Sequence, residues 1–486
     1  MEVRDNWTPA LDSNGVARIM TKGLPRPGED DYGAMKRTRA ALVLLAVLLV
    51  AALAAPSLPR AEAADASFVV TTLETLQQNY VDKLSAVTML NAALDALSQR
   101  TGVAPFDGPI PSGVDGGRAG VLFSQRFDEI FSKVRERYSQ TDLAYAAAAG
   151  MLESLHDSHT GFIPPPAYQE EKRKENGEAS FTGIGIVLLQ RDGQYYIREV
   201  FPDSPAAAAG LHALDRLVEV NGRTTSGKPT DEVSGSIRGQ AGTTVVVKIE
   251  RPNAAGALEF SVVRRPIRVP GLTSQMLDGG IGYVRIYEFV PGVGTGLRGA
   301  LFSLRREGLR ALIVDLRGNP GGLVDELRDI SAALLPQNSP ILQMTSRSGR
   351  TLVMETMQPP ILSAAVPIVT LVDEGSASAS ELLASALQEQ ARAVIAGVKT
   401  AGAVEIGITV DLPEEAGLAV TVARLLSGKG VRLEGRGVIP DEQQSLDTPA
   451  LNEGHDTQFD RALTLVKQKL AERSHQSRLP AAAGSL

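Results

Sequence analysis

The chain has 486 residues, 43% of them hydrophobic and 22% charged, a composition typical of a globular protein with roughly two to four domains. Its formal net charge of −7 gives no reason to expect nucleic acid or an anionic membrane surface as a partner. Because the chain has no cysteine, disulfides, thiolate metal sites and a cysteine nucleophile are excluded.

The N-terminal residues have the pattern of a secretion signal. A basic stretch, 35–39, precedes sixteen uncharged and mostly aliphatic residues, 40–55, a length that is short for a membrane span. The small residues Ala61 and Ala63 suit cleavage before Ala64.

Two interpretations of this segment stay open. Either residues 1–34 are an extra extension before a signal peptide at 35–63, or 35–63 is an uncleaved anchor. In both cases we expect most of the protein to be secreted, periplasmic or held on the extracytoplasmic side of a membrane through residues 40–55.

Residues 64–178 are predicted to be an N-terminal helical region. Apolar residues recur at three- and four-residue spacing in three stretches, 68–98, 127–138 and 143–155. Glycine and proline are frequent over 102–120, which is therefore expected to be a loop. The last helical stretch ends before residues 157–162, and the prolines at 164–166 prevent its continuation.

Residues 179–268 are predicted to form a separate β-rich unit. It begins with the loop Gly183-Ile184-Gly185-Ile186, followed by the small-residue segment 204–211 and by residues 215–222. These motifs together resemble a PDZ domain of the bacterial type. In such a domain the backbone N–H groups of the glycine loop bind a terminal carboxylate, and the adjacent strand edge pairs with a peptide. Leu214 departs from the family pattern, which usually has glycine before the aspartate.

Residues 269–446 are predicted to form an α/β unit. Short apolar runs typical of buried strands occur at five places, 281–286, 311–316, 366–372, 393–397 and 418–422. Helical patterns alternate with them, which predicts a largely parallel sheet covered by helices. Residues 447–486 are expected to form one more helix, about 458–473, and a disordered tail.

Residues 375–381 connect one of these strands to a helix and carry three serines. A strand-to-helix turn places a side chain beside the free N–H groups of a helix N-terminus, which suits a nucleophile and its oxyanion donors. Alternatively, Ser378 and Glu381 simply form a capping box for the helix. Residues 315–322 contain three glycines, which free backbone N–H groups for a ligand, although such a loop alone is most often just a tight turn.

Taken together in chain order, these motifs resemble those of the C-terminal processing peptidases, also called tail-specific proteases. The resemblance covers about residues 68–441. It implies a protease core of the crotonase or ClpP type in an α/β multidomain chain. It also implies that Ser378 is the nucleophile and that the other two serines of its turn are structural. The oxyanion hole would come from the N–H groups of Ala379 and of Gly321 or Gly322.

The sequence departs from this family at the general base. The position of the family's lysine is occupied by Ala403, and the glutamine that orients the lysine falls on Gly407. An alanine cannot take a proton, so the serine–lysine pair is absent. Lys399 is the nearest lysine, but four extended residues displace it by more than about 10 Å, and a solvated surface lysine is the alternative.

A histidine is the better candidate for the base. Ser158-His159 resembles the serine–histidine pair of the tricorn-type relatives, and Glu434 resembles the acidic residue that completes their relay. Lysine-type members often carry a histidine at this place without using it, so a structural role for His159 stays open. No set of His, Asp and Glu has metal-ligand spacing, and we expect neither a metal nor a cofactor.

We therefore predict a serine endopeptidase that binds C-terminal tails of polypeptides on its PDZ unit and hydrolyses peptide bonds. The rival hypothesis is a catalytically inactive PDZ scaffold, or regulatory pseudo-protease, which Ala403 favours. A serine-directed fluorophosphonate probe separates the two, because a scaffold shows no labelling that depends on Ser378.

Overall fold

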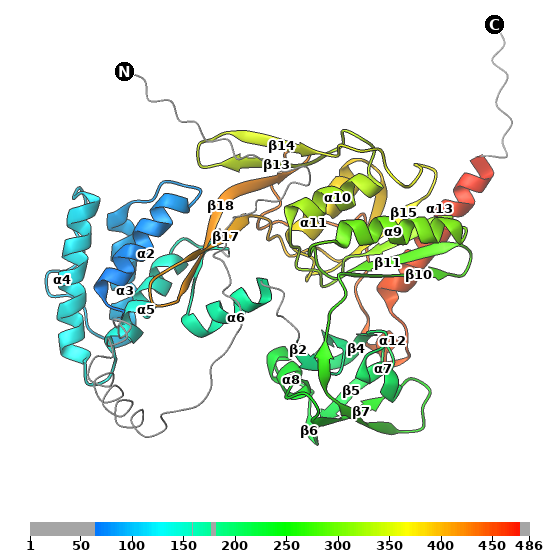
Figure 1. The fold of residues 1–486 in the computed structure, drawn as a ribbon, viewed down its shortest axis with the longest axis horizontal. Helices are drawn as coiled ribbons and strands as arrows, with labels where there is room; N and C mark the ends of the chain where they lie inside the picture. The colour runs from blue at the N-terminus through cyan, green and yellow to red at the C-terminus, as the bar shows by residue number, and fades with distance from the viewer. Residues whose placement is uncertain (1–63, 158, 176–180, 477–486) are drawn as a thin grey trace, which may run out of the picture. The chain divides into compact units, whose positions relative to one another are not determined.

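The computed structural model describes residues 64–157, 159–175 and 181–476. The predicted extension and signal, Ser158 and the predicted C-terminal tail lie outside the described residues. Within the described ranges, no helix combines the length and the apolar character that a membrane crossing requires. Figure 1 shows the described elements, with labels on most of them.

The described chain begins with a bundle of helices, as predicted. Its helices are α2 (Ala66–Asn79), α3 (Ala86–Thr101), α4 (Gly116–Val134) and α5 (Gln140–Glu153) (Figure 1). Each follows a Ser or Asp whose side chain accepts a backbone N–H of the first turn. The loop predicted over 102–120 is too long at its C-terminal end, because Asp115 caps α4 and the helix then begins with two glycines.

An antiparallel sheet packs against this bundle. Its strands are β1 (Gly161–Ile163), β13 (Pro340–Ser346), β14 (Thr351–Glu355), β17 (Ile406–Asp411) and β18 (Gly417–Ser427), and α6 (Pro165–Glu175) follows β1. The prediction that 418–422 belong to the parallel sheet is wrong, because they lie in β18. Leu418 and Val420 pack with the helical bundle, and β18 is mostly buried. A strand buried on both faces has the apolar run of a parallel strand, which explains the error.

The PDZ-like unit is built on a sheet with the order β3-β4-β5-β7-β8. Its strands are β3 (Ile186–Arg191), β4 (Gln194–Val200), β5 (Arg216–Val220), β6 (Arg223–Thr224), β7 (Thr244–Glu250) and β8 (Ala257–Val263). Its helices are α7 (Pro205–Ala209) and α8 (Thr230–Ile237), and β2 (Phe181–Gly183) pairs with β9 (Arg265–Ile267). Among the described strands β3 pairs only with β4, so its other edge is open to a further strand.

The departure from the family pattern at Leu214 has a packing role. Its φ of 67° is a conformation that costs a non-glycine residue on the order of 1 kcal/mol. The side chain packs on a small hydrophobic cluster made by Leu189, Tyr196, Leu446 and Leu451. The Tyr196 hydroxyl also donates to Asn452 Oδ1 at 2.9 Å. Helix α12 (Thr448–Asn452) is therefore held against the β3–β4 hairpin.

The α/β core contains a sheet with the order β10-β11-β12-β15-β16-β19 among the described residues. Its strands are β10 (Leu272–Leu277), β11 (Ile281–Ile286), β12 (Ala311–Asp315), β15 (Ile368–Val372), β16 (Ala393–Gly397) and β19 (Glu442–Gln443). Only the β10–β11 pair of this sheet is antiparallel, so the predicted, largely parallel sheet is confirmed.

Helices cover both faces of this core sheet (Figure 1). They are α9 (Val293–Arg306), α10 (Val324–Leu334), α11 (Ala379–Glu389) and α13 (Thr457–Gln476). Leu312 and Val314 of β12 pack in the core with α9, α10 and α11, whereas Ala311 and Ile313 pack with α13. This alternation follows from the two-residue period of a strand.

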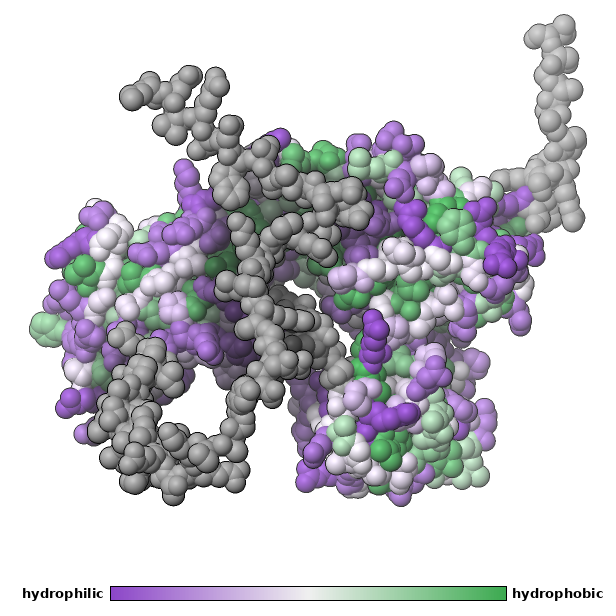
Figure 2. All heavy atoms as spheres, viewed as in Figure 1, coloured by the Kyte–Doolittle hydropathy of each residue, from purple (hydrophilic) through white to green (hydrophobic). Residues whose placement is uncertain are grey.

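Exposed apolar side chains are dispersed over the surface. Figure 2 shows hydrophilic and hydrophobic residues interspersed on the visible face of the described residues. The most exposed large apolar side chains come from separate parts of the sequence, namely Phe106, Phe302, Met357 and Ile439. Scattered apolar residues are usual on protein surfaces and do not by themselves mark an interaction site.

Candidate active site

The candidate site lies at the carboxyl ends of two neighbouring strands of the core sheet. β12 and β15 are parallel partners, with Val314 opposite Thr370. β12 leads into the glycine-rich loop 316–323, and β15 leads into the serine turn 373–378. The carboxyl ends of parallel strands meet at one edge of a sheet, which is where α/β proteins usually bind their ligands.

Ser378 directly precedes α11, and its backbone is strained. Its φ of 53° and ψ of −117° lie outside the regions that L-residues favour. The Ser378 N–H donates to Ala403 O at 2.8 Å and to Glu381 Oε2 at 3.1 Å, and these bonds hold the conformation. A sharp strand-to-helix turn of this kind presents a serine hydroxyl for nucleophilic attack.

The buried Glu381 carboxylate ties the serine turn to a neighbouring segment, 400–403. Besides the Ser378 N–H, it accepts the Thr400 hydroxyl and the N–H groups of Gly402 and Ala403, the last two at 2.7 and 2.9 Å. Glu381 therefore makes its half of the predicted capping box, but this is one of four hydrogen bonds. Since a carboxylate has about four acceptor sites, the side chain is saturated.

Gly321 lies directly against Ser378. A Cβ atom on Gly321 would lie 2.6 Å from Ser378 Cβ and 2.9 Å from Ala379 N, so only glycine fits. The Gly321 N–H donates to Asn319 Oδ1 at 2.8 Å. In contrast, the N–H groups of Ala379 and Gly322 donate to no group in the described part of the chain, which leaves them available to an oxyanion.

The other two serines of the turn hold the loops together. Ser376 Oγ donates to Leu316 O at 2.8 Å, and Ser380 Oγ donates to Asn319 O at 3.1 Å. Both side chains are buried. Their hydroxyl groups are thus engaged with the glycine-rich loop, in keeping with the structural role expected for them.

One short segment, 403–407, lies beside Ser378, Glu434 and His159. Ala403, at the position of the family's lysine, accepts the Ser378 N–H. Glu434 Oε2 accepts the next backbone N–H at 2.8 Å. At the far end, a Cβ on the segment's glycine would lie 3.6 Å from the carbonyl oxygen of His159. Ser378 and Glu434 therefore both bond to the backbone of this segment.

Asp157 holds the loop that carries His159. Its Oδ1 accepts the His159 N–H at 2.9 Å and lies 3.9 Å from the ring Nδ1, and its Oδ2 accepts the Thr160 hydroxyl at 3.0 Å. Burial disfavours the charged form, but hydrogen bonds from His159, Thr421, Thr160 and Tyr80 hold the pKa of Asp157 below its ordinary value. A carboxylate therefore stands beside the imidazole at neutral pH.

Lys399, the alternative base, has different surroundings. Its side chain is exposed, and no hydrogen bond or ion pair found among the described residues includes it. The next side chain, Thr400, points inward to Glu381. Lys399 is thus exposed to solvent, whereas its neighbour is buried against Glu381.

A polar pocket of about 300 Å³ lies beside segment 403–407. Three carboxylates line it, those of Asp157, Glu405 and Glu434. Burial and the charge of Glu434 raise the pKa of Glu405 to about 6, although the Leu425 N–H donates to its Oε2 at 3.1 Å. Sequence reasoning missed Glu405, because its local pattern does not distinguish it from a surface glutamate.

The predicted tail-binding loop forms one end of a groove of about 410 Å³ in the PDZ-like unit. Gly185 has a φ of 82°, and a Cβ there would lie 2.4 Å from Ser204 Cβ. The N–H groups of Ile184 and Gly185 donate to no described group, so they are available to a carboxylate. Apolar side chains form the walls, among them Ile184, Ile186, Phe201 and Ile237.

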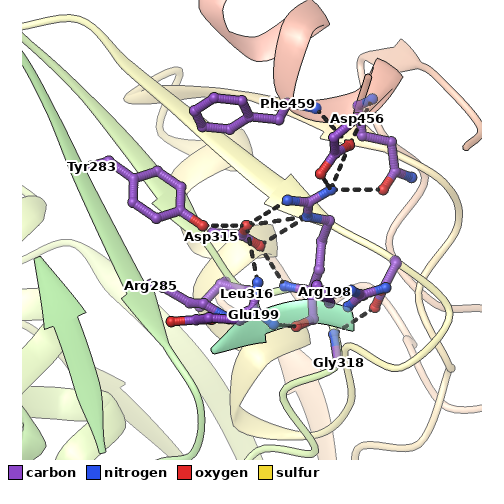
Figure 3. A network of polar contacts seen from close by, with 12 residues as sticks. Arg198, Glu199, Tyr283, Arg285, Asp315, Leu316, Gly318, Asp456 and Phe459 are labelled. Carbon is purple, nitrogen blue, oxygen red and sulfur yellow. Dashed lines mark hydrogen bonds and ion pairs between the residues drawn. The ribbon is translucent and has the colours of Figure 1, made fainter. Parts of the chain in front are cut away.

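A network of buried charges joins this unit to the core (Figure 3). Arg285 of β11 contacts Glu199 of β4 and Asp315 at the end of β12, at 3.1 and 3.2 Å. Arg317 pairs with the same Asp315 at 2.7 Å and with Asp456 at 2.8 Å. Burial opposes the charge of Asp315, but Arg317 and Arg285 hold its pKa well below its usual range.

Asp373 extends this network to both loops of the site. Arg198 of β4 donates to Asp373 Oδ2 at 3.0 Å. Asp373 Oδ1 accepts the N–H of Gly318 at 2.6 Å and that of Gly375 at 3.0 Å. Sequence reasoning missed Asp373, because two of its partners, Gly318 and Arg198, are 55 and 175 residues away along the chain.

Two family models match the chain: residues 280–444 match peptidase family S41, and residues 196–251 match a PDZ domain. The chain is 30% identical over 323 residues to the carboxy-terminal processing protease CtpA of Bacillus subtilis, covering 66% of this chain and 68% of that protein. It is 31% identical over 336 residues to the carboxyl-terminal-processing protease of a Picosynechococcus species, covering 68% of this chain and 80% of that protein. A solved protein of Bacteroides fragilis described as an S41 protease is 18% identical and aligns with a TM-score of 0.51. It covers 82% of this chain and 97% of that one, a likeness of fold.

Replacing Gly321 tests the close contact with the serine turn. Gly321→Ala should displace Ser378 and Ala379, and we expect the rate of labelling by a fluorophosphonate to fall about 10²-fold or more. Gly308→Ala is the control, because Gly308 has a similar φ of 93° and no atom within 4 Å of an added Cβ. The control should lose about 1 kcal/mol of stability and keep its labelling rate. Equal labelling in the two variants would contradict the assignment of Gly321.

The raised pKa of Glu405 predicts that the stability of the folded chain depends on pH. Since its pKa is near 6 in the folded chain and near 4.5 in an unfolded one, the folded state holds this proton more tightly. The stabilisation from this proton is present below about pH 4.5 and is lost as the pH rises through 6. Glu405→Gln should therefore raise the thermal midpoint at pH 7.5, by about 2 °C after allowance for solvent screening, and raise it less at pH 5. Calorimetry at both pH values checks this, and a gain that is larger at pH 5 contradicts it.

Proposed function

Because the chain belongs to the carboxyl-terminal processing proteases, serine-type peptidases of family S41 with a PDZ domain, we propose that it binds C-terminal tails of polypeptides and hydrolyses their peptide bonds at Ser378. The observation that carries the assignment of Ser378 is its strained turn, with the Ala379 N–H and the glycine-rich loop directly beside it. We take residues 179–268 as the tail-binding domain and 269–446 as the peptidase core.

The mechanism follows from the groups at this turn. Ser378 Oγ attacks the scissile carbonyl carbon, and the carbonyl oxygen becomes an oxyanion. The N–H groups of Ala379 and Gly322 stabilise that charge, because they are donors with no other acceptor among the described residues. The tetrahedral intermediate then expels the amine, and water releases the acyl group from Ser378 in a second step.

His159 is our candidate for the base that takes the Ser378 proton and returns it to the leaving amine. It is supported by the resemblance of Ser158-His159 to the serine–histidine pair of the tricorn-type relatives, and its main chain lies against Gly407, four residues along the chain from the Ala403 that bonds Ser378. Glu434, which contacts segment 403–407, and Ser158 complete the group by resemblance to the tricorn-type relatives. An imidazole is a competent base near pH 7, whereas Ala403 offers no proton acceptor.

Single substitutions separate a peptidase from a scaffold and identify its base. Ser378→Ala should abolish turnover of an unfolded polypeptide with a free C-terminus while tail binding persists. His159→Ala should lower kcat by at least about 10³-fold. Lys399→Ala is the matched control and should retain full activity. Turnover is followed by mass spectrometry of the products. The presence of a reactive serine is measured by fluorophosphonate labelling.

Two outcomes contradict these assignments. If Ser378→Ala turns substrate over at the wild-type rate, Ser378 is not the nucleophile. If His159→Ala does so, His159 is not the base. A wild-type chain that binds tails but shows neither turnover nor labelling at Ser378 is the PDZ scaffold that the alanine at position 403 favours.

We also propose that the chain acts outside the cytoplasm, on the strength of the signal-like pattern at residues 35–63. N-terminal sequencing of the protein from its native cells should give Ala64 as the first residue of an exported form. An uncleaved chain in the membrane fraction points to the anchor instead. An uncleaved chain in the cytoplasmic fraction contradicts both.

A further inference from the structure

Asp157 lies two residues before His159, in the loop that follows α5. Its Oδ1 accepts the His159 N–H at 2.9 Å, and the same oxygen lies 3.9 Å from the ring Nδ1. One carboxylate oxygen is therefore close to both the main chain and the side chain of His159. The side chains of Asp157 and His159 are only 12% and 21% exposed, so water and salt screen this charge contact incompletely.

Separate parts of the fold hold the Asp157 carboxylate in place. Thr160, in the same loop, donates its hydroxyl to Asp157 Oδ2 at 3.0 Å. Thr421 of β18 and Tyr80, which directly follows α2, donate their hydroxyl groups to the same carboxylate. The Thr421 N–H donates to Thr160 Oγ1 at 3.1 Å, and the Val81 N–H donates to Thr421 O at 2.8 Å. The helical bundle and β18 thus fix this carboxylate beside the imidazole.

The same contacts keep Asp157 charged. Burial disfavours its charged form, but the hydrogen bonds hold the pKa of Asp157 below its ordinary value. Burial and the negative charge of Asp157 raise the pKa of Tyr80 well above its ordinary value, so the phenol keeps its hydrogen and stays a donor. A fixed negative charge therefore lies beside His159 at neutral pH.

This charge decides which ring nitrogen of the neutral imidazole carries the hydrogen. An N–H at Nδ1 is attracted to the carboxylate, whereas a lone pair at Nδ1 is repelled by it. Asp157 therefore favours the form with the hydrogen on Nδ1 and the lone pair on Nε2. Nε2 is then the atom that takes a proton, and the charge also stabilises the imidazolium that forms.

Glu434 is the acidic residue that the resemblance assigns to the histidine. Its Oε2 accepts the Val404 N–H at 2.8 Å, so this oxygen holds segment 403–407. The carboxylates of Glu434 and Asp157 line the same pocket. Separate substitutions of the two residues therefore show which of them acts on the imidazole.

We propose that Asp157 is a positioning residue for the base, which fixes the tautomer of the His159 ring and stabilises its protonated form during proton transfer from Ser378. The role in catalysis rests on the proposed function, because it requires that His159 takes the serine proton. It also gives the helical bundle a part in the reaction, since Tyr80 at the end of α2 holds the carboxylate.

Asp157→Asn removes the charge and keeps the size of the side chain and an oxygen for the His159 N–H. Nitrogen NMR of isotope-labelled histidine reports which ring nitrogen carries hydrogen, and His159→Gln identifies the His159 signals by their loss. We expect the Nδ1–H form in the wild-type chain and a mixture with the Nε2–H form in Asp157→Asn. The kcat for an unfolded polypeptide should fall about 10²-fold with KM unchanged, and Asp157→Glu, which keeps the charge, should recover most of it.

Two control variants remove one negative charge each. Asp82→Asn removes a carboxylate that also acts on Tyr80 but pairs with Arg424, so it should keep the wild-type ring form and kcat. Glu434→Gln should keep the ring form, because the oxygen of that side chain bonds to the Val404 N–H.

An unchanged ring form in Asp157→Asn overturns the proposal, and a fall in kcat without a change of ring form shows a merely structural role. A change of ring form in Glu434→Gln but not in Asp157→Asn overturns it in favour of Glu434. Wild-type turnover in His159→Ala is a different result. It removes the base from the proposed function, and the catalytic role of Asp157 fails with it even if the ring form depends on Asp157.

Discussion

The geometry of the site depends on one buried carboxylate. Glu381 sits in the first turn of α11 and accepts hydrogen bonds from the serine turn on one side and from residues 400–403 on the other. A buried carboxylate is costly unless it is fully hydrogen-bonded, so the four donors and the acceptor stabilise each other. The same contact keeps Ser378 at a φ that a serine otherwise avoids, and the strain is held in place by the surrounding structure.

The same hydrogen bonds also involve Ala403, which occupies the position of the family's lysine. Ala403 uses both its N–H, to Glu381, and its carbonyl oxygen, to Ser378, so the backbone at this position is built into the site even though the side chain is inert. The hydrogen-bonded backbone around Ser378 is therefore complete, and a proton acceptor for its hydroxyl would have to come from another element. In the proposed mechanism this acceptor is His159, in the loop after α5, which Asp157 fixes.

Much of the fold follows from local patterns, because buried strands such as β12 and β15 are short β-branched runs and the turn at Ser378 lies between such a strand and a helical pattern. The start of α4 was hidden by its two glycines, since only the Asp115 cap indicates a helix there. Long-range partners have no local signal. The pairing of Arg198 with Asp373 and the reach of Glu381 to Thr400 join residues 175 and 19 positions apart, so the sequence predicts the motifs but not the contacts between them.

The contact between α12 and the β3–β4 hairpin bears on how freely the PDZ domain can be exchanged. An inserted domain is usually joined to its host by two linkers, and it can then be replaced as a cassette. Here a third stretch of chain, from the far end of the core, packs on Tyr196 and Leu214. A chimaera that takes this domain from a relative would need matching residues around Leu451 as well. The PDZ domain and the C-terminal segment of this chain would therefore have to be exchanged together.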